Sequence, residues 1–172
     1  MISIFRAKEL DSNAIVNIGT ISVGDAHRDS CSAEDLQEYL ERNYNDDSIK
    51  KELNDSKNIY HIIKFNETPV GFSKIVLNYS HDNIEQKNIS KLDRIYLLKE
   101  FHGLKLGSKL LEFNIELAKR NSQSGIWLFT WVGNSKAVNF YTKYGFKIIG
   151  SHMFQVSETH YNENHHMFFQ FT

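Results

Sequence analysis

A strand that runs through a glycine turn into a long helix constrains this fold more than any other segment. Branched and aromatic residues over 91–98 predict the strand, and apolar residues at every third or fourth position over 104–121 predict the helix. Gly103 marks the turn between them. This arrangement directs free backbone N–H groups and the positive end of the helix at one point, which suits a phosphate group. Lys105 and Lys109 add positive charge beside that point.

The spacing of the glycines excludes two well-known phosphate loops. A P-loop needs four residues between its glycines and then Lys-Ser/Thr, whereas three residues separate Gly103 from Gly107, and Ser108 precedes Lys109. A dinucleotide fingerprint needs three glycines early in a strand–helix–strand unit, and this segment has two in mid-chain. Two interpretations stay open: a phosphate site of another kind, or a plain turn in which Gly107 allows close helix packing.

The periodicity of the whole sequence predicts an α/β fold. We expect strands over 2–6, 59–65, 70–77, 91–98, 126–132, 146–154 and 167–171. We expect helices over 11–24, 33–44, 46–55, 104–121 and 135–144, with N-caps at Ser32 and Asn134. Three antiparallel strands between helices, followed by strand–helix–strand crossovers, give a three-layer fold. Its mixed, mainly antiparallel sheet of about seven strands carries helices on both faces.

Length and charge limit the organisation and the partners of the chain. The 172 residues suit one domain over 1–172, without linker, repeat or low-complexity segment. The 20 basic and 21 acidic side chains give a net charge of −1. This balance argues against a nucleic-acid partner and against binding to an anionic membrane.

Cysteine, histidine and hydropathy limit the environment. Cys31 is the only cysteine, so an internal disulfide and a cysteine-based zinc site are excluded. The spacing of His160, His165 and His166 matches no standard ligand set, so we expect no metal. We find no signal-peptide pattern and no apolar run long enough to span a membrane. We therefore expect a cytoplasmic protein.

Two motifs resemble those of the GNAT superfamily of N-acetyltransferases. The first is Asp93-Arg94-Ile95-Tyr96-Leu97, followed by the glycine turn into the helix. The second runs from Asn134 to Phe146 and follows the superfamily pattern Asn-x-x-Ala-x-x-x-Tyr-x-x-x-Gly-Phe, which makes it the more specific match. The resemblance covers roughly residues 2–172. Within the superfamily, the chain is most similar to PaiA-type spermidine/spermine acetyltransferases.

The resemblance implies acetyl-CoA as the cofactor, with its pyrophosphate at the glycine turn. Strands that splay after Leu97 and before Trp131 would admit the pantetheine arm. The implied cofactor-binding residues are Ile95, Tyr96, Leu97, His102, Gly103, Leu104, Lys105, Leu106, Gly107, Ser108, Lys109, Asn134 and Tyr141. The superfamily has a glycine where this chain has Lys105, and a side chain there restricts the backbone. If Lys105 already lies in the helix, we expect its N–H to remain a phosphate donor.

Two side chains match the acid and the base that acetyl transfer to an amine needs. An alkylamine is mostly protonated at pH 7, so a base must take its proton, and the departing thiolate needs an acid. Tyr141 matches the superfamily's acid, with an ordinary core aromatic as the alternative. Asp93 is the candidate base, directly or through water, with a salt bridge to Arg94 as the alternative. A backbone N–H near Leu97 would polarise the thioester carbonyl.

An acidic segment predicts the acceptor. Residues 25–55 carry ten carboxylates against four basic side chains, a net charge of −6, which suits a polycation such as spermidine or spermine. An acidic surface without a binding role is the alternative. The candidate acceptor residues are Asp25, Glu34, Tyr39 and Trp131.

We therefore predict an acetyl-CoA-dependent N-acetyltransferase that acts on polyamines. The alternatives are the same reaction on a peptide N-terminus, a lysine or an aminoglycoside, and a non-catalytic acyl-CoA-binding regulatory module. Members of the superfamily often pair, so the resemblance also implies a homodimer.

Overall fold

Seven strands form one sheet in the computed structural model, which describes residues 1–172. The strands are β1 (Ile2–Arg6), β2 (Ile59–Phe65), β3 (Thr68–Val76), β4 (Ile89–Leu97), β5 (Gly125–Trp131), β6 (Lys147–Gln155) and β7 (Tyr161–Gln170). The helices are α1 (Ser12–His27), α2 (Ala33–Asn43), α3 (Asp46–Asn54), α4 (Leu106–Arg120) and α5 (Ser135–Lys143). Two short 3-10 turns are η1 (Glu9–Asp11) and η2 (Lys99–Phe101).

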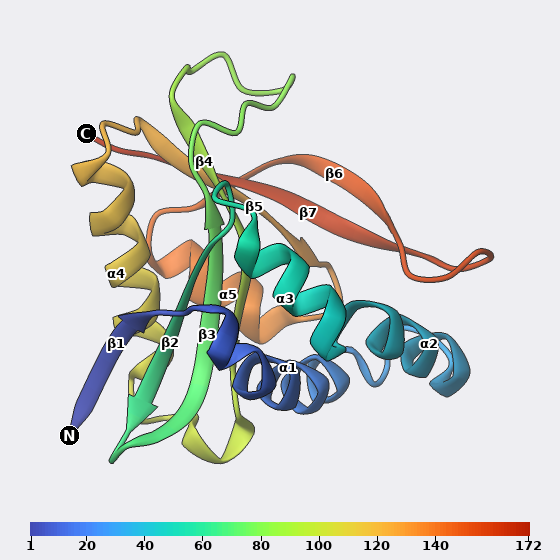
Figure 1. Cartoon of the computed structure of the whole chain (residues 1–172). Coiled ribbons are helices and arrows are strands. Elements are labelled where there is room, and N and C mark those ends of the chain that lie inside the picture. Colours follow the sequence, from blue (N-terminus) through green and yellow to red (C-terminus); the bar gives the residue numbers. More distant parts are fainter.

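The sheet is mixed and mainly antiparallel, as expected. Its order is β1-β2-β3-β4-β5-β7-β6, and only β4 and β5 pair in parallel. Helices α1, α2 and α3 cover one face, which we call the α1–α3 face, and α4 and α5 cover the other, the α4–α5 face (Figure 1). The expected three-layer α/β fold is confirmed.

Each face of the sheet has its own apolar core. On the α1–α3 face, Ile15 and Ile18 of α1 pack with Phe72 of β3. On the α4–α5 face, Leu111 of α4 packs with Ile126 of β5. All five side chains are almost fully buried, and burying a side chain of this size contributes about 2 kcal/mol to stability. The sheet is therefore packed on both faces, with β5 contributing to the core on the α4–α5 face.

All twelve expected strands and helices are present, with differences at some ends. α1 continues to His27 instead of ending near residue 24, and α4 begins at Leu106 instead of 104. The predicted start of β7 at residue 167 was wrong, because the strand begins at Tyr161. Residues 161–166 are polar and give no apolar alternation, but their backbone pairs with β6 from Gln155 to Gly150.

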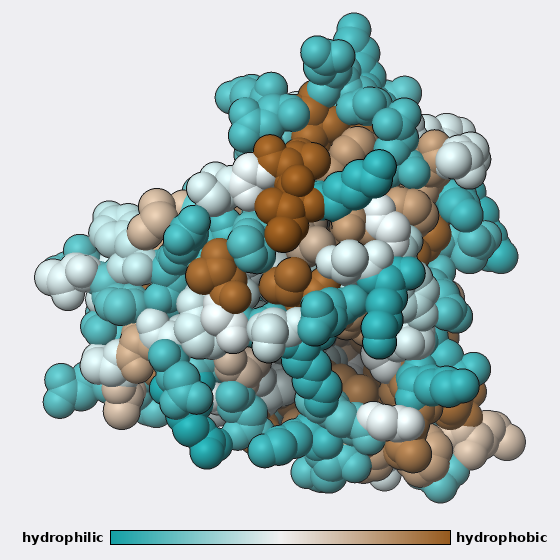
Figure 2. Space-filling model, turned by 180° about the vertical axis from the view of Figure 1, so that it is seen from behind, coloured by the Kyte–Doolittle hydropathy of each residue, from teal (hydrophilic) through white to brown (hydrophobic).

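The surface behind the sheet is mostly hydrophilic. Figure 2 shows the molecule from behind, with apolar side chains gathered in the middle of that view. The edge strand β6 exposes Ile148, Ile149 and Met153 to solvent. None of the helices has both the length and the apolar character that crossing a membrane requires.

Candidate active site

β4 and β5 pair over a short distance and then diverge. The paired residues are Ile89 with Gly125, Ser90 with Ile126 and Lys91 with Trp127. Beyond Lys91, β4 stays paired with β3, and β5 stays paired with β7. The divergence was expected after Leu97 and begins earlier, so residues 92–97 of β4 have no partner in β5.

The free edge of β4 presents backbone hydrogen-bonding groups. Leu98 N–H donates to Val70 O of β3 at 2.9 Å. Because these groups alternate in direction along a strand, those of Ile95 and Leu97 point towards β5. Leu97 N–H therefore lies at the divergence, together with the other backbone groups that the sequence assigned to the cofactor.

The turn before α4 contains two residues with positive φ. Gly103 has a φ of 84°, and Lys105 has a φ of 59° and a ψ of 17°. Lys105 does not lie within the helix, because it is a left-handed N-cap residue that precedes the first helical residue, Leu106, so the condition attached to its N–H as a phosphate donor is not met. A side chain in this conformation costs about 1 kcal/mol relative to glycine.

Helix packing does not explain Gly107. A Cβ added there would meet only Phe140, at 4.0 Å, which is an ordinary contact distance. The plain-turn interpretation of this residue is therefore removed, while Gly103 is explained by its positive φ. The first N–H groups of α4, at residues 106–108, have no acceptor within the helix and face any ligand at its N-terminus.

His102 ties this turn to β4 and to α5. Its Nε2 donates to Leu97 O at 3.1 Å, and its Nδ1 accepts from Lys136 Nζ at 3.1 Å. Lys136 was not among the predicted site residues, although it lies inside the second motif, two residues after Asn134. It brings a further positive charge to the turn.

α5 positions Asn134 and Tyr141. Asn134 Oδ1 accepts from Ala137 N–H at 3.1 Å, so the N-cap is confirmed, and its amide N–H groups stay available. The Tyr141 side chain is 8 % exposed and packs on Phe146. Its hydroxyl makes no hydrogen bond within the chain, and burial raises the pKa of Tyr141, so the phenol is protonated at neutral pH.

Asp93 is the extra residue of a β-bulge. Lys74 of β3 pairs with Arg94 and Ile75 pairs with Leu92, so Asp93 has no partner in β3. Bulges often re-aim a side chain beside an active site.

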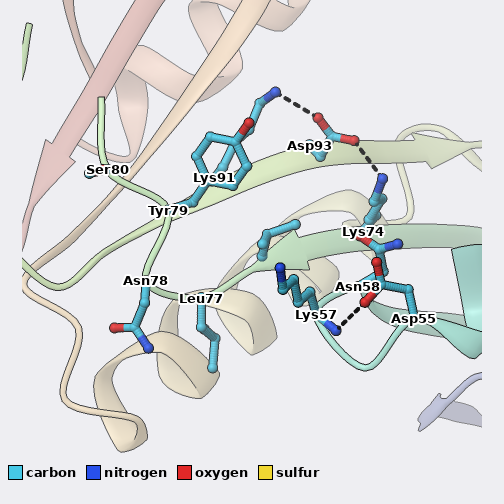
Figure 3. A pocket seen from close by; sticks show the side chains of 11 residues that line it. Asp55, Lys57, Asn58, Lys74, Leu77, Asn78, Tyr79, Ser80, Lys91 and Asp93 are labelled. Carbon is cyan, nitrogen blue, oxygen red and sulfur yellow. Dashed lines mark hydrogen bonds and ion pairs between the residues drawn. The ribbon is translucent and has the colours of Figure 1, made fainter. Parts of the chain in front are cut away.

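Two ammonium groups hold the carboxylate of Asp93 (Figure 3). Lys74 Nζ lies 3.0 Å from one oxygen, and Lys91 Nζ lies 2.9 Å from the other. Burial acts in the opposite direction, but these charges lower the pKa of Asp93 to about 2. The alternative salt bridge to Arg94 is not formed, because Arg94 pairs with Glu52. Asp93 is therefore ionised at neutral pH and binds a proton weakly.

Glu52 of α3 is the centre of a network that the sequence did not predict. It lies 2.8 Å from Lys74 Nζ and accepts from the Tyr60 hydroxyl at 2.6 Å. Arg94 donates to Glu52 at 3.2 Å and to Tyr60 at 2.8 Å. These residues come from four separate elements, so no local spacing could have indicated the network.

The predicted acceptor residues do not form one cluster. Asp25 pairs with Arg28 at 2.7 Å on the surface of α1, and Glu34 is exposed in the first turn of α2. Tyr39 is largely enclosed and packs on Phe154 of β6. Trp131 packs on His27 at the end of α1.

A pocket of about 650 Å³ opens on the α1–α3 face (Figure 3). Its charged lining residues are Asp55, Lys57, Lys74, Lys91 and Asp93. Three lysines outnumber two aspartates, so the pocket itself gives no preference for a polycation. No group of three or more His, Cys, Asp or Glu side chains has the geometry to hold a metal ion.

A family model and several solved structures match the chain. The model of the acetyltransferase (GNAT) family matches residues 21–146. An uncharacterised N-acetyltransferase from the pepI 3′ region of Lactobacillus delbrueckii subsp. lactis is 27% identical over 157 residues, which are 91% of each chain.

Two solved structures share the fold. The PaiA N-acetyltransferase of Thermoplasma acidophilum, in complex with coenzyme A, has a TM-score of 0.80 at 19% identity and covers 99% of each chain. The ribosomal-protein-S18-alanine N-acetyltransferase of Escherichia coli has a TM-score of 0.72 at 13% identity, over 99% of this chain and 94% of that one.

Proposed function

We propose that this chain, which belongs to the acetyltransferase (GNAT) family, acetylates a primary amine of a polyamine such as spermidine. The family makes it an acetyl-CoA-dependent N-acetyltransferase. The choice of a polyamine as the acceptor goes beyond what membership of the family shows. The observation that carries the reaction is the divergence of β4 and β5 beside the N-terminus of α4.

The residues at the divergence fit acetyl-CoA, which supplies an activated acetyl thioester when bound. The free N–H groups at the start of α4 and the ammonium of Lys136 suit its phosphates. The room beside Gly107 lets a phosphate approach the backbone. The unpaired edge of β4 and the free amide of Asn134 suit the amides of pantetheine.

The proton donor in this proposal is Tyr141. Its phenol is kept protonated by burial and is not engaged by another group of the chain. Leu97 N–H is the candidate donor to the thioester carbonyl. Asp93 is the base that the motif implies, and its two ion pairs favour a water-mediated role over direct proton transfer.

The acidic segment 25–55 supports a polyamine acceptor. It forms the end of α1 and the whole of α2 and α3, so its negative charge lies on the side of the sheet that carries Asp93. That charge would steer a polycation towards this face. Asp25 and Glu34 remain in the proposal as contacts to the acceptor at the periphery of the site. Acetylation of a peptide N-terminus, a lysine or an aminoglycoside is the competing outcome.

Thiol release from acetyl-CoA tests the proposal directly. The acceptor panel is spermidine, spermine, kanamycin and a short peptide with a free N-terminus and one lysine. We expect the highest kcat/KM with a polyamine. A higher value for kanamycin or the peptide would overturn the polyamine, and coenzyme A binding without turnover would indicate a non-catalytic module.

A homodimer and a cytoplasmic location complete the proposal. The exposed apolar residues of the edge strand β6 support a contact between copies, which sedimentation velocity tests. The lone Cys31, which forms no disulfide, is compatible with a reducing compartment.

A further inference from the structure

His27 closes α1 and lies against β5. Its ring centroid is 5.9 Å from that of Trp131, the last residue of β5. Gly133 makes room for this indole, because a Cβ at Gly133 would collide with the Trp131 ring. The sequence predicted that α1 ends near residue 24, which left His27 outside any element.

The position of Trp131 places His27 at the divergence of the two strands. Trp131 lies four residues beyond the last β4–β5 pair, Lys91 with Trp127, where the two strands have already diverged. Successive side chains of β5 point to opposite faces of the sheet. One alternate set packs in the core on the α4–α5 face, and Trp131 belongs to the other set, so its side chain lies on the α1–α3 face. His27 therefore lies on the α1–α3 face, against the end of β5 that extends beyond the divergence.

The imidazole of His27 is available as a base. It is partly exposed, and neither ring nitrogen is hydrogen-bonded within the chain or sealed from solvent. β5 has no titratable side chain, and the charged neighbours along the chain are Asp25, Arg28 and Asp29, of which the first two pair with each other. Burial lowers the pKa of His27, so its ring is neutral at pH 7.

Asp93 is less suited to direct proton transfer. Its carboxylate is fixed between Lys74 and Lys91, and its low pKa gives little driving force for taking a proton from an ammonium group. A base works best when its pKa is near the working pH. Burial lowers the pKa of His27 from the ordinary value of a histidine, which lies near neutral pH, whereas the pKa of Asp93 is about 2.

We propose that His27 is the catalytic base that takes the proton from the acceptor's ammonium group. One N–H bond of the ammonium breaks, and its proton binds a ring nitrogen of His27. The electron pair stays on the amine nitrogen for attack, and the imidazolium releases its proton to solvent. This inference rests on the proposed N-acetyltransferase function and changes the identity of its base.

The test is the pH dependence of kcat/KM for the panel amine with the highest turnover. The unmodified enzyme should lose activity on the acid side as His27 becomes protonated. His27→Gln should lower kcat/KM at pH 7 by about 10²-fold and remove that limb. His165 is a half-buried histidine on the opposite face of the sheet, so His165→Gln is the matched control. This variant should keep both the kcat/KM at pH 7 and the loss of activity on the acid side.

Coenzyme A affinity and the midpoint of thermal unfolding check that His27→Gln is folded. An unchanged acid limb in His27→Gln would overturn the inference, and loss of the limb in Asp93→Asn alone would assign the base to Asp93. An unmodified enzyme that acetylates no panel amine would overturn the proposed function instead, and with it this role of His27.

Discussion

The carboxylate of Asp93 in β4 lies 3.0 Å from the ammonium of Lys74 in β3. The pKa of Asp93 is about 2, below its ordinary value, so this ion pair stabilises the fold above pH 4 and loses its effect as the pH falls towards 2. Asp93→Asn should lower the free energy of unfolding by about 2 kcal/mol at pH 7.

Urea denaturation at pH 7, 4 and 2.5 measures that effect. The difference between the unmodified protein and Asp93→Asn should shrink with falling pH, because the unfolded carboxylate becomes protonated first. Asp82→Asn, in an exposed loop and without an ion pair, is the control and should show no such trend. A difference independent of pH would mean that Asp93 acts by packing rather than by charge.

Most of the fold could be predicted because its elements have strong local signals. The helix of Leu111 and Ile115 shows a 3.6-residue period, and Asn134 and Gly145 mark the two ends of α5. β7 is the exception, because its first residues are polar and are recruited by backbone pairing with β6. Backbone pairing with the preceding strand of a hairpin leaves no trace in the side-chain pattern of residues 161–166.

The site residues also divide into those that local motifs predict and those that only the tertiary fold brings together. The glycine turn, Asn134 and Tyr141 belong to contiguous motifs and could be found by spacing. Glu52 and Lys74 could not, because α3 and β3 meet Asp93 only through the tertiary fold. The left-handed conformation of Lys105 was also missed, since a lysine gives no signal for positive φ.

Lys105→Gly should relieve backbone strain at the N-terminus of α4. We expect up to about 1 kcal/mol of added stability and a coenzyme A Kd that stays the same or falls. Ser122→Gly, at another residue with positive φ (57°), is the matched control for strain away from the turn. Calorimetric titration with coenzyme A decides the case: a Kd at least tenfold higher in Lys105→Gly would show that the Lys105 ammonium itself contacts the cofactor.

Tyr141→Phe separates proton donation from packing. The ring and its contact with Phe146 are kept, so coenzyme A affinity should change less than twofold. Loss of the hydroxyl should reduce kcat by about 10²-fold, the usual range for a general acid. Tyr144→Phe removes a hydroxyl that bonds Glu112 at 2.7 Å and serves as the control. Equal kcat values for Tyr141→Phe and the unmodified enzyme would remove Tyr141 from the chemistry.

Gly133→Ala tests whether the position of the Trp131 ring affects binding of the acceptor amine. An added Cβ collides with the Trp131 indole and must displace it, together with its contact to His27. We expect KM for the amine to rise several-fold while the Kd of coenzyme A is unchanged. Gly24→Ala is the matched control, because a Cβ there meets Leu40 at an ordinary 3.6 Å and alanine favours the helix. A change in coenzyme A affinity without a change in KM would place Trp131 on the cofactor side of the strands.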